Sequence, residues 1–162
     1  MHPAFTASRT SIRLCGVAIP GAADRQKKIP GFEQEVFSRT RVLCVGAGGL
    51  ISQIAPTLVR KGLGGITLLD DDIAETSNLN RQRFYIKDVG RNKALALAEN
   101  LLPECIAETE IHGIPFRLQE AIARDLDLSC DVAICGVDNN PARIETSQYF
   151  RAKGVPLICS SL

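Results

Sequence analysis

Short apolar runs alternate along the chain with longer segments of helical character. Five runs of four or five residues have the length expected of buried strands. They are residues 41–45, 66–69, 107–111, 132–135 and 156–159. A regular alternation of strands and helices is typical of parallel sheets. The pattern therefore predicts an α/β fold, a Rossmann-like, doubly wound and mostly parallel sheet with helices on both faces.

One helix is predicted before the first of these strands and four between or after the others. They cover residues 32–38, 50–61, 92–102, 118–126 and 141–153. Pro103 ends the third helix and Pro141 opens the fifth, both favourable positions for proline. Pro56 falls inside the second helix, where it either kinks the helix or has to be accommodated near the first turns. Residues 73–85 are expected to form loops and short turns.

Composition limits the class of protein. The chain has 162 residues, of which 45% are hydrophobic, and a formal net charge of +1. This suits one ordinary globular domain and argues against nonspecific binding to nucleic acid or to a membrane. Residues 1–30 are interrupted by Pro and Gly, so we expect an irregular N-terminal arm followed by one domain over residues 31–162. The six cysteines form no Cys-x-x-Cys pair, which predicts neither a zinc site nor a redox dithiol and suits a reducing cytoplasm.

A glycine-rich loop, VGAGGL at residues 45–50, follows the first predicted strand. Gly46, Gly48 and Gly49 allow the backbone to turn tightly and to approach a phosphate, with a helix N-terminus behind it. Ile51 occupies the position of the usual third glycine. Such turns also connect strands to helices without any ligand, so this loop alone leaves nucleotide binding open.

Acidic residues end the second predicted strand. Asp70 lies about twenty residues beyond the glycine loop, where a carboxylate can accept hydrogen bonds from ribose hydroxyls. Asp72 is a weaker candidate for the same site. The alternative is a solvated acidic turn.

Cationic and amide side chains follow this acidic turn. Asn78, Arg81, Gln82 and Lys93 offer donors suited to phosphate oxygens, with Arg as a fork and Lys as a movable point charge. In isolation these residues would be an ordinary polar loop. Behind a glycine loop and a ribose carboxylate, they favour phosphate binding.

Asp138 follows the fourth predicted strand, at the edge where ligands bind in doubly wound sheets. Its carboxylate could hold Mg²⁺ among phosphates, because Mg²⁺ prefers oxygen ligands. The alternative is a helix-capping role for this segment, in which Asn140 before Pro141 is a suitable cap.

Four motifs, VGAGGL, LLDDDIAETSNLNRQ, DVGRNKA and DNNPAR, occur in one order over residues 32–162. In order and spacing this stretch resembles the ThiF/MoeB-type adenylyltransferases, relatives of the ubiquitin-activating enzymes. The resemblance implies an enzyme that binds ATP and Mg²⁺. It also implies adenylation of the C-terminal glycine carboxylate of a ubiquitin-like or sulfur-carrier protein, with release of pyrophosphate.

The resemblance also implies roles for individual residues. Asp70 would bind ribose, Arg81 and Lys93 would hold phosphates together with Asn78, and Asp138 would coordinate Mg²⁺. The nucleotide loop would consist of Gly46, Gly48 and Gly49. Arg81, Lys93 and Asp138 would be the catalytic residues, acting by positioning and charge neutralisation.

The chain departs from the family pattern in several places. Ile51 and Pro56 are unusual in the glycine loop and in the helix after it. The family often forms dimers in which an N-terminal arginine enters the partner's site, so we expect a homodimer, although Arg9, Arg13 and Arg25 have no clear match. Family elements such as a catalytic cysteine or a zinc pair would follow residue 162, so we expect the adenylation domain to be truncated at its C-terminal end.

Two other interpretations stay open at this point. One is an NAD(P)-dependent oxidoreductase domain, which would need a catalytic residue on the nicotinamide side. The other is a catalytically inactive nucleotide-binding partner subunit. The presence of Arg81, Lys93 and Asp138 together argues against a lost ATP site.

Overall fold

A computed structural model describes residues 10–160 and contains one six-stranded sheet with the order β1-β4-β3-β2-β5-β6. All neighbouring strands are parallel except β1 and β4, which are antiparallel. The strands are β1 (Ile12–Cys15), β2 (Arg41–Val45), β3 (Gly65–Leu69), β4 (Glu110–Ile114), β5 (Val132–Cys135) and β6 (Leu157–Cys159). The predicted mostly parallel sheet is thus confirmed.

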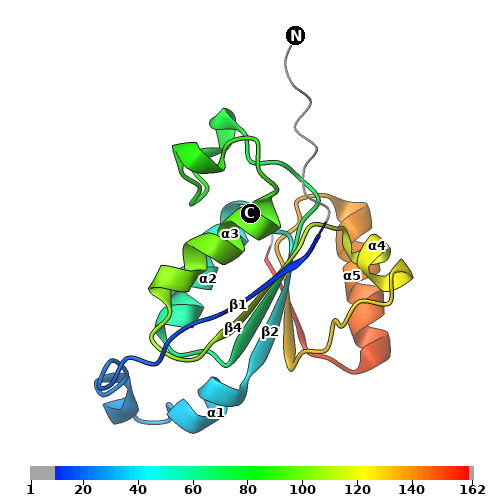
Figure 1. Cartoon of the computed structure of the whole chain (residues 1–162). Helices are drawn as coiled ribbons and strands as arrows, with labels where there is room; N and C mark the ends of the chain where they lie inside the picture. The colour runs from blue at the N-terminus through cyan, green and yellow to red at the C-terminus, as the bar shows by residue number, and fades with distance from the viewer. Residues whose placement is uncertain (1–9, 161–162) are drawn as a thin grey trace.

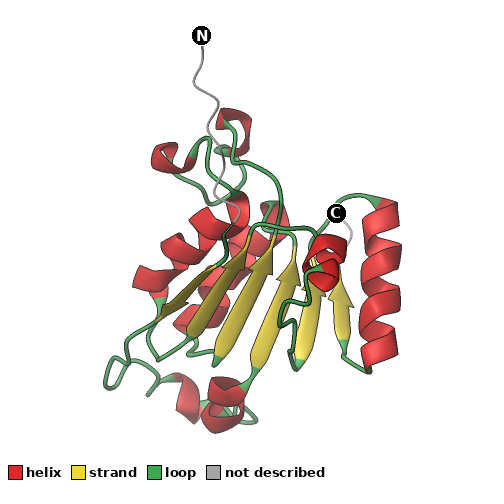
Figure 2. Cartoon of the chain, turned by 45° about the vertical axis from the view of Figure 1, so that its right-hand side comes forward, coloured by secondary structure: helices red, strands yellow, loops and turns green. Residues whose placement is uncertain are grey.

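Helices cover both faces of the sheet, as Figures 1 and 2 show. They are α1 (Gln34–Arg39), α2 (Gly49–Arg60), α3 (Lys93–Leu101), α4 (Leu118–Ala123) and α5 (Asn140–Lys153). On one face, α2 and α3 bury small and branched side chains, Ala55 and Leu97 among them, in one core cluster. On the other face, Phe150 of α5 and Ala121 of α4 belong to a second cluster. Helices α2, α3, α4 and α5 are therefore held to the sheet by their apolar sides.

The predicted irregular arm contains a strand that the sequence analysis missed. Residues Ile12–Cys15 pair with β4, with Ile12 opposite Gly113 and Leu14 opposite Ile111. Ile12 and Leu14 pack against the α2/α3 core, whereas Arg13 between them is exposed. This apolar–polar alternation is the pattern of an edge strand, too short to stand out among the Pro and Gly residues around it. The division of the chain into an arm and a domain stays a prediction.

Strand β4 lies three residues later than predicted. The structure begins it at Glu110, because residues before it form a turn in which the Thr109 N–H donates to the Ala107 carbonyl (2.8 Å). The Thr109 hydroxyl also donates to the carbonyl of Leu63 (2.6 Å). His112 and Gly113 obscured the run in the sequence, although both are buried in the strand.

The remaining differences are small. Helix α2 includes Pro56 in its interior, and Pro56 is buried. Helix α4 ends at Ala123, three residues before the predicted end. The loop over residues 73–85 contains the short 3₁₀ helix Thr76–Asn78, and a second one follows at Ile86–Asp88. No helix among residues 10–160 is long and apolar enough to cross a membrane.

Candidate functional site

A cavity of about 870 Å³ lies at the carboxyl ends of the central strands. Parallel strands place the residues that follow them along one edge of the sheet, which is where doubly wound folds bind ligands. All the predicted site residues except Asn78 line this cavity. They are Gly46, Gly48, Gly49, Asp70, Asp72, Arg81, Gln82, Lys93 and Asp138.

The glycine loop forms the floor of the cavity between β2 and α2. Gly46 has a φ of +96°, and a side chain there would lie 3.3 Å from the backbone of Gly136. Gly48 and Gly49 have more room. A Cβ at Gly49 would meet nothing within 4 Å, and one at Gly48 would lie 3.8 Å from the Gln82 amide nitrogen. Gly46 is therefore required by the turn, whereas Gly48 and Gly49 leave the N-terminus of α2 open to an approaching anion.

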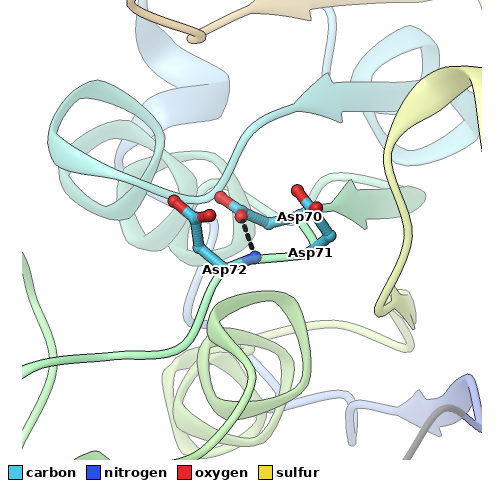
Figure 3. Close-up of side chains that lie close together, drawn as sticks. All are labelled: Asp70, Asp71 and Asp72. Atoms are coloured by element: carbon cyan, nitrogen blue, oxygen red, sulfur yellow. Dashed lines mark hydrogen bonds between the residues drawn. The ribbon is translucent and has the colours of Figure 1, made fainter.

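Asp70 organises the loop beside it. One carboxylate oxygen accepts the Ala47 N–H (2.7 Å) and the other accepts the Asp72 N–H (2.8 Å). Figure 3 shows the second of these bonds within the Asp70–Asp72 turn. Burial raises the pKa of Asp70 to about 6, and the two backbone hydrogen bonds oppose this rise. Asp70 thus joins the end of β3 to the glycine loop, a role the sequence analysis did not predict.

Cations already neutralise the carboxylates next to Asp70. The Lys93 ammonium lies 3.1 Å from Asp72, and the Arg117 guanidinium lies 2.6 Å from Asp71. Lys93 is the first residue of α3, and only 10% of its side chain is exposed. The helix start is fixed by Asn92, which donates to the carbonyls of Asp70 (2.8 Å) and Asp72 (3.2 Å). The Lys93 side chain is therefore directed at the acidic turn.

Helix α2 holds the Arg81–Gln82 segment beside the glycine loop. The side-chain amide of Gln53 donates to the Arg81 carbonyl (3.1 Å), and the buried Ser52 hydroxyl accepts the Arg83 N–H (3.1 Å). The Arg81 side chain is exposed at the cavity wall and donates to the Ser77 carbonyl (2.8 Å). The amide oxygen of Gln82 is buried and has no partner among the described residues.

Asn78 is the predicted phosphate ligand that the structure does not bring to the cavity. Its side chain is buried and accepts the N–H of Glu75 (3.0 Å), closing a 3₁₀ turn. Its carbonyl accepts the N–H groups of Arg81 and Gln82. Asn78 therefore shapes the segment that presents the next two predicted residues.

Asp138 follows β5 and lines the cavity with an exposed side chain. Within residues 10–160 no hydrogen bond or ion pair involves its carboxylate. The cap of α5 is Asn139, which accepts the Ala142 N–H (2.9 Å), and not Asn140 as expected. Capping thus leaves the Asp138 carboxylate available as an oxygen ligand.

The sequence analysis assigned no site role to several polar residues of the cavity wall. They are Asp71, Arg117, Gln119, Glu120, Asn139, Arg143, Glu145, Thr146 and Ser160. Arg117 follows β4 and Arg143 lies in the first turns of α5, where its Nε donates to the Val137 carbonyl (2.8 Å). Their positions in the sequence could have indicated them, because residues that follow parallel strands meet at the carboxyl edge of the sheet.

Two of the three arginines of the predicted arm, Arg13 and Arg25, do not line the cavity of their own chain. Arg13 is part of β1 and Arg25 precedes a short 3₁₀ helix. Arg9 lies outside the described residues.

A glycine turn between a parallel strand and a helix, with a carboxylate ending the next strand, defines the class of nucleotide-binding α/β domains. The ThiF family model matches residues 23–162, and the chain belongs to this family.

Several curated relatives are similar over most of the chain. The probable molybdopterin-synthase adenylyltransferase of Porphyra purpurea is 36% identical over 73% of the chain and 30% of its own length. The sulfur carrier protein adenylyltransferase of Thermus thermophilus is 32% identical over 80% of the chain and 48% of its own length. The chain thus spans less than half the length of these relatives.

Solved structures agree with the fold. The tRNA N6-threonylcarbamoyladenosine dehydratase TcdA of E. coli matches with a TM-score of 0.70 and 26% identity, over 85% of this chain and 59% of that one. The same enzyme in complex with ATP matches with a TM-score of 0.64 and 28% identity, over 78% of this chain and 52% of that one.

Proposed function

We propose that this chain binds ATP with Mg²⁺ and adenylates the C-terminal glycine carboxylate of a ubiquitin-like or sulfur-carrier protein. The observation that carries the proposal is the convergence of Gly48, Asp70, Arg81, Lys93 and Asp138 on one cavity. Relatives named as adenylyltransferases and a structural neighbour in complex with ATP support it.

The residues of the cavity wall position the nucleotide. Its phosphates lie over Gly48 and Gly49 at the start of α2. Ribose hydroxyls donate to the remaining lone pairs of Asp70, which the two backbone N–H groups leave available. Arg81 and Lys93 contact phosphate oxygens. To do so, Lys93 leaves its ion pair with Asp72 and pairs with phosphate.

The residues of the cavity fit Mg²⁺. Asp138 is a carboxylate without a partner among the described residues, whereas Asp71 and Asp72 are paired with cations. Mg²⁺ in nucleotide sites is usually held by one or two carboxylates together with phosphates and waters. We assign Asp138 as its ligand, and the ion would neutralise phosphate charge.

The chemistry needs no nucleophile from the protein. A carboxylate oxygen of the carrier's C-terminal glycine attacks the α-phosphorus, and the bond from that phosphorus to the bridging oxygen breaks. Pyrophosphate leaves with the electron pair of that bond. Arg81 and Lys93 stabilise the charge that develops on the phosphates, and the cavity holds the reactants in line.

ATP–pyrophosphate exchange tests this reaction. The chain is incubated with ATP, Mg²⁺, labelled pyrophosphate and carrier proteins that end in Gly-Gly, and label appearing in ATP is measured. A carrier lacking its last glycine is the control and should give no exchange. Absence of exchange with every carrier, from a chain that binds ATP, would contradict the adenylation step.

The nucleotide preference separates this function from an oxidoreductase. ATP with Mg²⁺ should raise the melting temperature more than NAD⁺ at equal concentration, because ligand binding to the folded state stabilises it. Arg81 and Lys93 beside the glycine loop suit a triphosphate better than a diphosphate bridge. Equal or larger stabilisation by NAD⁺ would reject the ATP assignment.

We also propose that the chain forms a homodimer. The resemblance to dimeric adenylyltransferases supports this, as does the frequency of two-fold symmetric dimers among soluble proteins. Light scattering with and without ATP and Mg²⁺ measures the mass directly. A monomer at high micromolar concentration in both conditions would contradict a dimer of this chain.

A further inference from the structure

Arg117 lines the cavity on the β4 side of the Asp70–Asp72 turn, and Lys93 contacts the same turn through Asp72. Arg117 follows β4, which lies on the other side of β3 from β2 and its glycine loop. Ile114 at the end of β4 is in register with Leu69, and its carbonyl accepts the Asp70 N–H (3.2 Å). The chain after β4 therefore runs beside the Asp70–Asp72 turn.

The strand order β2-β3-β4 determines which part of a bound nucleotide lies near Arg117. Phosphates over the glycine loop and ribose at Asp70 place two points of the nucleotide along the strand ends β2 and β3. The base continues in the same direction, toward the end of β4. The cavity wall there contains Arg117 and the almost fully buried Leu118, an apolar side chain at 3% exposure.

The Arg117 guanidinium is bound by one carboxylate and keeps other N–H groups available. Its Nε donates to Asp71 (2.6 Å), and within residues 10–160 no other hydrogen bond or ion pair involves this side chain. The side chain is 71% exposed, so the planar cation is accessible to a ligand. Arg guanidinium planes stack on aromatic rings, and every nucleobase has a π-face.

We propose that Arg117 stacks on the base of the bound nucleotide and that Asp71 is a positioning residue that fixes the guanidinium plane. The proposal rests on the proposed binding of ATP. It assigns Asp71 and Arg117 to base recognition, in contrast to Arg81 and Lys93, which act on phosphates.

Calorimetry with two ligands tests the stacking. ATP with Mg²⁺ carries a base, and inorganic tripolyphosphate with Mg²⁺ does not. Arg117→Ala should weaken ATP binding about 10-fold and change tripolyphosphate binding by less than about twofold, because stacking acts on the base alone. Arg117→Lys keeps the charge but loses the plane, so its ATP affinity should resemble that of Arg117→Ala. Arg151→Ala, which removes an exposed arginine of α5 outside the cavity, is the matched control.

The other possible results each contradict a specific part of the proposal. Equal weakening of both ligands by Arg117→Ala would make Arg117 a phosphate cation, as would full rescue by Arg117→Lys. Unchanged ATP binding in Arg117→Ala would make it a surface residue. A parent chain that binds neither ligand would reject the proposed function itself, whereas the first three outcomes leave that function standing.

Discussion

Single side chains in this site have structural roles that their positions in the sequence did not disclose. Asp70 was predicted as a ribose ligand, and the structure adds that both of its oxygens hold backbone N–H groups. Asn78 was predicted as a phosphate ligand and instead closes a turn. Residue type and spacing indicate which groups approach an edge of the sheet. They do not indicate whether a carboxylate or an amide bonds its own backbone first.

The raised pKa of Asp70 predicts a pH-dependent stability. Its value of about 6 in the folded protein exceeds the ordinary value of 3.8, so the folded state binds more protons than the unfolded state between these pH values. Protonated Asp70 therefore contributes stability below pH 4 that is lost as the pH rises through about 6. Relative to Asp70→Asn, which cannot titrate there, the parent should lose roughly 2–3 kcal/mol between pH 4 and pH 7. Urea denaturation at several pH values measures this, and parallel curves for the two proteins would contradict it.

The cysteines predict that this chain forms no thioester with a carrier. None of the six lines the cavity, and burial raises the pKa of Cys44 to about 12 and that of Cys130 to about 11. A thioester requires an accessible thiolate near the adenylate. Electrophoresis after incubation with carrier and ATP should reveal no conjugate that is sensitive to dithiothreitol. A conjugate that disappears on substitution of the exposed Cys15 or Cys159 would overturn this.

At the scale of elements, the sequence predicted the strands and helices that have a strong hydrophobic pattern. It missed the strand that forms only by pairing with another strand and misplaced the strand that it pairs with. Strand β2 and helix α3 match closely, because a continuous apolar run and a good cap mark them. Strand β1 has only four residues and depends on pairing with β4. Strand β4 contains His112 and Gly113, and a Cβ at Gly113 would meet Ala94 and Ile12 at 3.0–3.2 Å. Such tertiary requirements leave no periodic signal in a single sequence.

The crossover between β3 and α3 depends on one buried carboxylate. Asp88 is fully buried, and its Oδ2 accepts the Tyr85 N–H (2.9 Å) and an Asn100 amide N–H (2.7 Å). Asp88→Ala leaves these donors unpaired and should destabilise the fold by about 2–4 kcal/mol. ATP affinity should fall as well, since the crossover carries Arg81. Chemical denaturation and calorimetry measure both effects.

Glu108→Ala is the matched control for Asp88→Ala, because Glu108 is an exposed carboxylate that does not line the cavity. It should change stability by less than about 0.5 kcal/mol. An Asp88→Ala protein as stable as this control would mean that the DVG segment does not depend on its carboxylate.

At the scale of the whole molecule, the strand order explains why the site was predictable in outline. Five parallel strands place all following loops at one edge, so residues from Gly46 to Asp138 meet although they are far apart in sequence. The contribution of Arg117 was not predictable, because the segment after β4 has no marked motif, whereas Arg143 ends the DNNPAR motif after β5. The sequence therefore indicated the edge and its glycine loop, and the tertiary structure decided which side chains complete the wall.

The charges of the cavity wall have a consequence for how fast a nucleotide arrives. The wall contains six carboxylates, at positions 70, 71, 72, 120, 138 and 145, and four cations, at positions 81, 93, 117 and 143. Near neutral pH this excess of negative charge repels an approaching polyanion, although the chain as a whole has a net charge of +1. Added salt screens that repulsion within a Debye length of about 10 Å at 0.1 M. The association rate constant of metal-free ATP, measured by stopped flow, should therefore rise with ionic strength, and that of MgATP should rise less. Steering by the four cations would give the opposite slope.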